Sequence, residues 1–336
     1  MGKTRIPEGY SPKLNLYDTQ AGIELIKKTF LEALSAMLRL RRVSAPLFVN
    51  PADGLNDDLN GVERAVRFDI PAIGGDAEVV HSLAKWKRYA LGRYGFRPGR
   101  GIVTDMDAIR RDEELDNLHS IYVDQWDWEK VITREERNTE TLKSTVRGIV
   151  DALYYTQQVV CARYEALEPY LKDGGVTFIT SEELRRLYPD KTPKERENAF
   201  VREHGTTFLM QIGATLGDGT RHDGRAPDYD DWTMNGDILV YHPLLDCAFE
   251  LSSMGIRVDA ETLKKQLAAV HCENRLKLTY HRMLVNDEMP LTIGGGIGQS
   301  RTCMLLLNKA HIGEVQSSLW DAETLRVAEA AGVTLL

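Results

Sequence analysis

A glycine run that ends in an arginine is the clearest candidate for chemistry in this chain. Residues 292–301 read Thr-Ile-Gly-Gly-Gly-Ile-Gly-Gln-Ser-Arg. The spacing predicts a tight turn leading into a helix, whose first backbone N–H groups would face an anion. Arg301, inside that helix, would add a forked cation suited to phosphate oxygens. The run has neither the Lys-Ser/Thr pair of a P-loop nor the spacing of a dinucleotide fingerprint. A tight turn that binds nothing is the simpler alternative.

A strand expected over residues 120–129 has two unlike faces, because side chains alternate along a strand. One face holds Tyr122, Asp124, Trp126 and Trp128, and the other holds Val123, Gln125, Asp127 and Glu129. The tryptophan face would meet the core, and the polar face would line a solvent-filled space. The preceding strand, expected at residues 102–109, ends at Arg110, which could project over the polar face. A solvated antiparallel face is the simpler alternative.

Two carboxylates, Asp237 and Glu250, fall on neighbouring expected strands just before the glycine run. Hard oxygen ligands of this kind suit magnesium bound together with a nucleotide, since they leave room for water and phosphate. The pattern therefore predicts a magnesium site at these two residues. Asp228 and Asp231, in a proline-containing loop, are expected to be solvated turn formers.

The composition is that of one globular domain, and we assign residues 1–336 to it, with residues 1–18 as a partly flexible leader. The chain has 336 residues, of which 43% are hydrophobic and 27% charged, within the usual range for globular proteins. A net charge of -8 argues against a broad nucleic-acid surface. The sequence contains no signal peptide and no apolar run of about 18 residues, so we expect a cytoplasmic protein. Four irregularly spaced cysteines favour core packing over disulfides.

Helical periodicity places a long amphipathic helix at residues 19–42, followed by a strand at residues 43–49 that contains Pro46. Further helices are expected at residues 134–167, 181–188 and 193–204. After an aspartate-rich loop come two strands, the glycine turn and a final helix. The apolar stripe of the first helix comprises Ile23, Ile26, Phe30, Leu34, Met37 and Leu38. We expect this stripe and the strand through Pro46 to build a two-fold dimer.

Six ordered segments together resemble asparagine synthetase A, the family of ammonia-using aspartate–ammonia ligases. They are residues 81–88, 118–129, 225–232, 235–240, 249–259 and 292–301. This family is similar to the catalytic domain of class II aminoacyl-tRNA synthetases. The resemblance therefore implies an α+β fold with a mainly antiparallel sheet flanked by helices. It also implies a homodimer, because the segment around Pro46 resembles the dimer-forming motif 1.

The resemblance implies a two-step reaction whose small-molecule partners are aspartate, ATP and ammonia, with Mg²⁺ as cofactor. The side-chain carboxylate of aspartate would attack ATP to give β-aspartyl-adenylate and pyrophosphate. Ammonia would then displace AMP to give asparagine. No nucleic-acid or membrane partner is implied.

The resemblance also assigns roles to single residues. Arg110, Arg301 and Lys87 would be catalytic, with Arg110 on the α-phosphate and Arg301 on the distal phosphates. Lys87 and Arg257 would hold the unreacted carboxylate of aspartate. The ammonium would be surrounded by Asp57, Gln125, Asp127 and Asp230, and Ser252 and Ser253 would also contact the substrate. The ATP site would further include Leu118, Ser120, Asp237, Glu250, Gly294, Gly295 and Gly296, with Asp237 and Glu250 as the metal ligands.

Two other functions stay open at this point. A synthetase paralogue that handles tRNA would need a basic surface, and a regulatory homologue without activity should have lost an arginine or a metal carboxylate. The negative net charge and the presence of all the matched polar residues favour the ligase. We expect no anticodon-binding barrel before the catalytic body. We also expect no glutamine amidotransferase domain with an N-terminal cysteine, because residue 2 is Gly2. The motifs alone do not decide which carboxylate of aspartate faces ATP.

Overall fold

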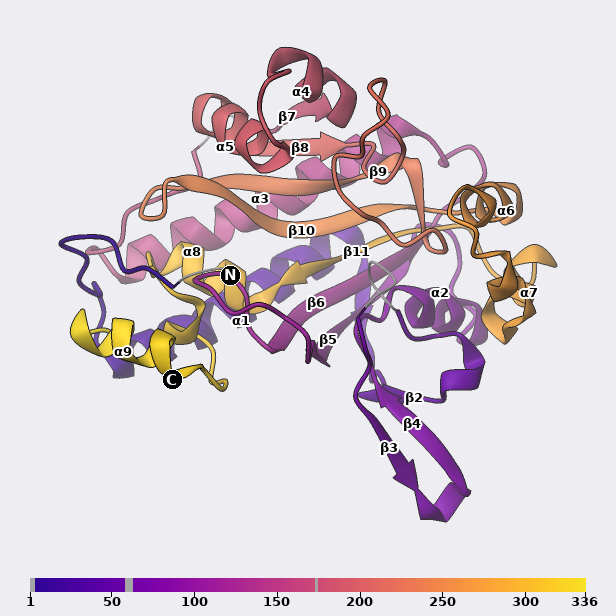
Figure 1. Cartoon of the computed structure of the whole chain (residues 1–336), viewed down its shortest axis with the longest axis horizontal. Coiled ribbons are helices and arrows are strands. Elements are labelled where there is room, and N and C mark those ends of the chain that lie inside the picture. The colour runs from indigo at the N-terminus through magenta and orange to yellow at the C-terminus, as the bar shows by residue number, and fades with distance from the viewer. Residues whose placement is uncertain (1–3, 58–62, 173–174) are drawn as a thin grey trace.

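An eight-stranded mixed sheet organises the chain (Figure 1), which we describe from a computed structural model at residues 4–57, 63–172 and 175–336. The strand order is β1-β5-β6-β11-β10-β9-β8-β7. Neighbours are antiparallel except for the parallel pairs β1–β5 and β7–β8 at the two edges. The strands are β1 (Leu40–Arg42), β5 (Gly101–Ile109), β6 (Tyr122–Val131), β7 (Thr177–Thr180), β8 (Thr207–Met210), β9 (Asp230–His242), β10 (Cys247–Arg257) and β11 (Thr292–Gly298).

Helices cover one face of this sheet and also lie at its β7–β8 edge and at one end of its strands. Figure 1 shows α1 and α3 behind the sheet, α4 and α5 beside β7 and β8, and α6 and α7 beside the right-hand ends of the central strands. No helix within the described ranges is both long enough and apolar enough to span a bilayer. The helices are α1 (Leu16–Leu38), α2 (Ala84–Arg93), α3 (Thr139–Arg163), α4 (Ser181–Leu187), α5 (Pro193–His204), α6 (Ala260–Ala269), α7 (Thr279–Val285), α8 (Gln299–Leu306) and α9 (Ala322–Ala330), with short 3-10 turns at Pro51–Asp53, Pro71–Ile73, Glu273–Lys277 and Ile312–Glu314.

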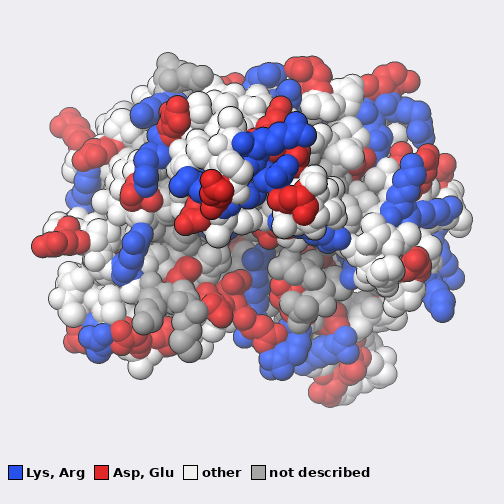
Figure 2. All heavy atoms as spheres, turned by 45° about the horizontal axis from the view of Figure 1, so that its top comes forward, with Lys and Arg blue, Asp and Glu red and all other residues white. Residues whose placement is uncertain are grey.

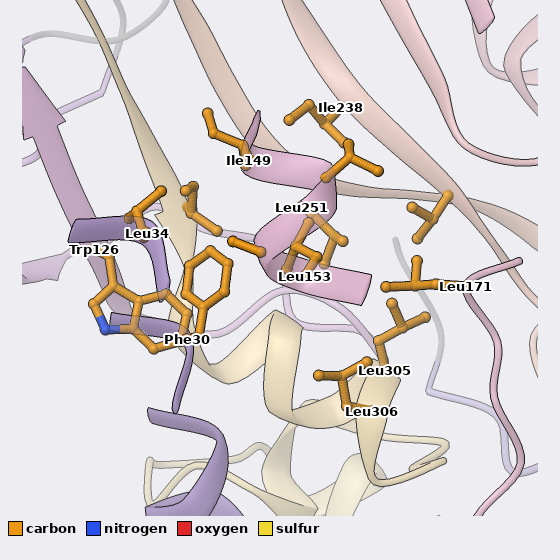
Figure 3. Packing of buried hydrophobic residues seen from close by; sticks show 14 of the residues in the cluster. Phe30, Leu34, Trp126, Ile149, Leu153, Leu171, Ile238, Leu251, Leu305 and Leu306 are labelled. Carbon is orange, nitrogen blue, oxygen red and sulfur yellow. The ribbon is translucent and has the colours of Figure 1, made fainter. Parts of the chain in front are cut away.

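The main hydrophobic core lies between the sheet and the helices α1, α3 and α8. Trp126 and Trp128 on β6 are 1% and 0% exposed, which confirms that the tryptophan face of this strand meets the core. Figure 3 shows Phe30 of α1 beside Trp126, and their ring centroids are 4.6 Å apart. Large aromatic side chains that lose nearly all their solvent contact contribute strongly to the stability of such a core.

The apolar stripe of α1 is therefore buried within the chain itself. Ile26, Phe30 and Leu34 are 0% exposed and belong to the main core. The prediction that this stripe forms a subunit interface is wrong for these residues, because α1 packs against α3 and α8 of the same chain and Phe30 packs against Trp126. Met37, at 48% exposure, lies outside the buried stripe.

A small three-stranded sheet projects from the body of the molecule (Figure 1). It consists of β2 (Phe48–Val49), β4 (Gly75–Val79) and β3 (Arg67–Ile70), in that order. Phe48 packs edge-to-face against Phe68 with a centroid distance of 5.3 Å. Leu47 and Ile73 are 52% and 65% exposed, so this projecting sheet presents apolar side chains to the surface.

The glycine run forms a strand, so the prediction of a glycine turn is wrong. Residues 292–298 make up β11, which is paired with β10 on one side and β6 on the other. A Cβ atom at Gly294 would overlap the Glu129 carboxylate, and one at Gly296 would overlap the Gln125 side chain. These glycines thus make room for polar side chains of the adjacent strand, and the helix α8 follows directly.

Several element boundaries differ from the sequence predictions for local reasons. The first helix stops at Leu38 because Arg39 is left-handed, and β1 then pairs with β5. Pro46 lies outside the short strand β2. The predictions for α4 and α5 are confirmed, and both helices begin with a capping box, which satisfies free N–H groups. The short strands β7 and β8 and the helices α6, α7 and α9 were not predicted.

The leader contacts the C-terminal part of the chain through Tyr10. Residues 1–3 of the predicted leader lie outside the described residues, whereas Tyr10 donates a hydrogen bond to Glu314 at 2.8 Å. The four cysteines are free thiols, and only Cys303 is fully buried. Figure 2 shows basic and acidic side chains interleaved over one face of the molecule.

The substitution Phe30→Ala tests the intrachain packing of α1. We expect it to lower the free energy of unfolding by about 3–5 kcal/mol, since it leaves a cavity against Trp126. Urea denaturation followed by tryptophan fluorescence measures the change. Glu32→Ala, at an exposed position of the same helix, should change the stability by no more than about 0.5 kcal/mol. Equal effects of the two substitutions would contradict this account of the core.

Candidate active site

A cavity of about 430 Å³ opens on the polar side of the sheet. Residues from the segments identified in the sequence meet in it, although they are up to 244 positions apart, from Asp57 to Arg301. Two predicted residues, Gly294 and Asp237, do not line the cavity, but Gly294 adjoins Gly295 and Asp237 pairs with Arg225, both of which do. The predicted residues that line the cavity are Asp57, Lys87, Arg110, Leu118, Ser120, Gln125, Asp127, Asp230, Glu250, Ser252, Ser253, Arg257, Gly295, Gly296 and Arg301.

A buried charge network forms the floor at one end of the cavity. Arg257 of β10 donates to Glu129 of β6 at 2.7 Å and also pairs with Asp230 of β9. Thr292 of β11 donates to the same Glu129 carboxylate at 2.7 Å. Burial opposes the charge of Glu129, but Arg257 outweighs it, so the pKa of Glu129 is lowered. Four adjacent strands thus meet in one ionic network.

Lys87 lies beside this network with 1% of its side chain exposed. Its Nζ donates to the Gly295 carbonyl at 2.8 Å and lies 3.3 Å from Asp127 Oδ2. Burial lowers the pKa of Lys87, and the charge of Asp127 opposes that shift. The helix α2 therefore supplies a cation that is fixed at the glycine strand and faces the cavity.

Asp237 and Glu250 lie at the other end of the cavity, each next to an arginine. Asp237 pairs with Arg225, while the Arg301 guanidinium donates to the Glu250 carbonyl at 3.0 Å and lies 3.8 Å from its carboxylate. Burial and the nearby charge of Glu250 raise the pKa of Asp237 to about 7, against the opposing effect of Arg225.

These two carboxylates fit a divalent cation. Asp237 Oδ1 is buried and has no hydrogen-bond donor within the described part of the chain, so it can accept a ligand. Within residues 4–57, 63–172 and 175–336, no group of three or more histidine, cysteine or acidic side chains has metal-binding geometry. Magnesium commonly binds one or two carboxylates and completes its shell with water and phosphate, so the pair is sufficient.

Three other predicted residues line the cavity from separate segments. Arg110 is about three-quarters buried, and its Nε has no acceptor among the described residues. The Ser120 hydroxyl donates to the Ser318 hydroxyl at 2.8 Å. The Ser82 hydroxyl donates to the Asp57 carboxylate at 3.1 Å. Arg110 therefore has an uncommitted donor for an anionic ligand.

The start of α8 is occupied by a carboxylate of the chain itself. The Ser300 N–H donates to Asp124 Oδ1 at 3.0 Å, and Gln316 also donates to this oxygen at 3.3 Å. This contact corrects the prediction that the first N–H groups of the helix face a bound anion. Asp124 instead fixes α8, and with it the position of Arg301, through the helix dipole.

Asp228 and Asp231 are buried, so the prediction that they are solvated is wrong. Asp228 is 0% exposed and accepts from Arg275 and His281, each at 2.9 Å, and lies 3.3 Å from Lys85. Asp231 is 3% exposed and pairs with Arg137 at 2.6 Å. Buried carboxylates require such partners, and here they come from other segments of the chain.

Arg225 and Lys194 line the cavity as well, although neither is among the site residues expected from the sequence. Arg225 stands at the head of a segment that was recognised, so its signal was present. Lys194 is on α5, where it lies 2.9 Å from Glu197. No motif surrounds Lys194, and its position follows only from the packing of α5 against β10.

Comparison with known proteins identifies the family. The family described as aspartate-ammonia ligase matches residues 17–332 of the chain. An aspartate–ammonia ligase of Clostridium perfringens is 56% identical over 337 residues and covers 100% of both chains. One of Ruminiclostridium cellulolyticum is 55% identical and covers 98% of both chains.

Solved structures give the fold independently. An asparaginyl-tRNA synthetase from Pyrococcus horikoshii, complexed with asparaginyl-adenylate, superposes with a TM-score of 0.66 at 14% identity. The match covers 94% of this chain and 76% of the synthetase. The predicted α+β architecture with a mainly antiparallel sheet is thereby confirmed. The chain belongs to the aspartate–ammonia ligase family of enzymes and has the class II aminoacyl-tRNA synthetase fold.

Proposed function

We propose that this chain makes asparagine from aspartate, ammonia and ATP through a β-aspartyl-adenylate. An oxygen of the side-chain carboxylate attacks the α-phosphorus of ATP, and the bond to pyrophosphate breaks. Ammonia then attacks the activated carbonyl carbon, the bond to AMP breaks, and one proton is released. The observation that carries the proposal is the single cavity in which a buried charge network and an arginine-flanked carboxylate pair meet. The name of the full-length relatives supports it.

The buried end of the cavity suits the main-chain groups of aspartate. Lys87 and Arg257 can hold a carboxylate there. Four carboxylates surround these two cations, and their excess of negative charge favours the binding of an ammonium. The four carboxylates belong to Asp57, Asp127, Glu129 and Asp230. An amino acid bound by its main-chain groups would direct its side-chain carboxylate away from this end.

The other end suits the phosphates of ATP. Glu250 and Arg257 are seven residues apart on β10, so a distance of roughly 20 Å along the strand separates them. Arg110 would bind the α-phosphate and Arg301 the distal phosphates. Cations held in place by protein contacts stabilise charge that develops in the transition state, and such stabilisation is commonly the largest catalytic contribution. No nucleophilic side chain is required in this scheme.

Asp237 and Glu250 would hold Mg²⁺ at the phosphate end. When bound, the ion supplies positive charge that neutralises phosphate oxygens. The accepting oxygen of Asp237 and the adjacent carboxylate of Glu250 support this assignment. The residues of the chain bind and orient the substrates around this position.

The assembly is proposed to be a two-fold homodimer, since symmetric dimers dominate homo-oligomers. The segment after Pro46 remains available for the interface, because Leu47 and Phe48 are exposed at 52% and 44%. Phe68 and Ile73 extend the same apolar area on the projecting sheet. The buried stripe of α1 takes no part in this proposal.

Trapping with hydroxylamine tests the proposed intermediate. With ATP, aspartate and hydroxylamine, we expect β-aspartyl hydroxamate, AMP and pyrophosphate, because the side-chain carboxyl is the one activated. Mass spectrometry distinguishes the β- from the α-hydroxamate by fragmentation. Formation of the α-hydroxamate alone, or a requirement for tRNA before AMP is released, would overturn the proposal.

A matched pair of arginine variants accompanies this experiment. Arg301→Ala should slow hydroxamate formation about 10²- to 10³-fold, the usual cost of removing one donor aimed at transition-state charge. Arg326→Ala removes an exposed arginine on α9, which pairs only with the exposed Glu323 in the described structure, and should leave the rate unchanged.

Magnesium titration tests the two carboxylates. Asp237→Asn and Glu250→Gln should each raise the magnesium concentration for half-maximal rate by about tenfold or more, because each removes a charged ligand contact. Glu261→Gln, which changes an exposed carboxylate on α6, serves as the control. An unchanged magnesium dependence in both site variants would refute the assignment.

Sedimentation measures the proposed assembly. At micromolar concentration we expect a mass twice that of the 37.9 kDa chain. Leu47→Asp should shift the equilibrium towards the monomer, since it places a charge in the apolar interface. Leu319→Asp, at a position that is 79% exposed and outside the projecting sheet, should have no effect. A monomer at all concentrations would contradict the dimer.

A further inference from the structure

We propose that Arg225 binds the distal phosphates of ATP from the side opposite Arg301. The Asp237–Glu250 pair would then lie between two guanidinium groups that contact the same polyphosphate. This inference rests on the ATP-dependent function proposed above. It adds a binding residue to the part of ATP that leaves as pyrophosphate.

Arg225 lies on the loop that precedes β9 and lines the cavity with 14% of its side chain exposed. One terminal nitrogen pairs with Asp237, and the other donates to the Gly224 carbonyl at 3.1 Å and lies 3.8 Å from the exposed Asp223 carboxylate. Its Nε is buried and finds no acceptor within the described ranges. A guanidinium has five N–H donors, so Arg225 keeps donors for a ligand after its contacts within the chain.

Arg225 and Arg301 reach the two carboxylates from different parts of the fold. Arg225 comes from the loop before β9 and holds Asp237, whereas Arg301 comes from α8 and lies 3.8 Å from Glu250. With both carboxylates ionised, as they would be around a bound cation, the charges of these four groups cancel. A divalent cation would leave two positive charges in excess, and an anionic polyphosphate would balance them.

The contact with Asp237 distinguishes Arg225 from Arg257. Magnesium held by one or two carboxylates commonly shares its shell with substrate phosphates, so a guanidinium in contact with Asp237 is within reach of those oxygens. Arg257 pairs with Glu129 and Asp230 at the buried end of the cavity, where the aspartate carboxylate is proposed to bind. Arg225 therefore belongs to the phosphate end and not to the aspartate end.

A purely structural role for Arg225 makes a different prediction. If the residue only stabilised the fold through its pair with Asp237, its loss would lower the thermal stability and affect every nucleotide alike. Any effect passed on through the magnesium site at Asp237 would disappear when ATP, pyrophosphate and AMP are titrated at saturating magnesium. A contact with the distal phosphates affects ATP and pyrophosphate but not AMP, which has no such phosphates. Equilibrium binding of these three ligands separates the two roles without relying on catalytic activity.

Isothermal titration calorimetry of the full chain with magnesium and each of ATP, pyrophosphate and AMP provides the test. Arg225→Met should weaken the binding of ATP and of pyrophosphate by about 10- to 100-fold, as expected for lost charge-assisted hydrogen bonds. The affinity for AMP should change by less than about threefold. Thermal unfolding of the same samples shows whether the variant is folded.

Arg221→Met is the matched control. Arg221 is exposed on the same loop, stacks 5.7 Å above the Trp232 ring and does not line the cavity, so all three affinities should be unchanged. Arg225→Lys gives the answer if the methionine variant does not fold. Lysine keeps the charge without the planar fork, so ATP should again lose more affinity than AMP.

The outcomes separate this inference from the function on which it rests. Tight binding of ATP by both the unaltered chain and the folded Arg225 variants would overturn only the role of Arg225. An equal loss of ATP and AMP affinity in the Arg225 variants would overturn it as well, in favour of the structural role. Failure of the unaltered chain to bind ATP would overturn the proposed function itself.

Discussion

The ionic network of Glu129, Arg257 and Asp230 is the constraint on which the rest of the site depends. All three side chains are at most 2% exposed, and charges removed from water in this way are tolerated only when they pair closely. Loss of one partner would leave an unpaired buried charge, which commonly costs about 3–5 kcal/mol. The network also requires Gly294, because a Cβ there would overlap the Glu129 carboxylate. Strands β6, β9, β10 and β11 are therefore held in one arrangement by the same residues that form the cavity floor.

This constraint divides the sheet into two unlike faces. On β6, Trp126 and Trp128 enter the core while Gln125, Asp127 and Glu129 point the other way, because the period of a strand is two. A shift of one residue in register would bury the charges among the helices and expose the tryptophans. Packing of α1 and α3 on the apolar face thus fixes the register that places the polar groups. The stability of the core and the geometry of the cavity depend on the same pairing.

The sequence predicts those parts of the structure that are encoded locally. The two faces of β6 follow from alternation, and α4 and α5 follow from their capping residues. The glycine run was identified as important but given the wrong conformation, since the reason for its glycines is the side chains of a strand more than 160 residues away. Asp228 was expected in solvent for a similar reason, because its partners Lys85, Arg275 and His281 lie in other segments. Short strands such as β7 and β8 carry too few residues for a periodic signal.

The fold does not by itself determine the chemistry, since one architecture can serve many reactions. What distinguishes the ends of this cavity is their charge. At the buried end, the carboxylates around Lys87 and Arg257 exceed the cations, which favours a ligand that carries both an ammonium and a carboxylate. At the Asp237–Glu250 end, Arg225 and Arg301 balance the two carboxylates, and a divalent cation would turn that balance positive. In the proposed reaction, this difference in charge would orient aspartate with its side-chain carboxylate towards the phosphates of ATP. Glu250 and Arg257 place β10 at both ends of the cavity, so this one strand would help to set the distance between the two parts of the proposed substrate site.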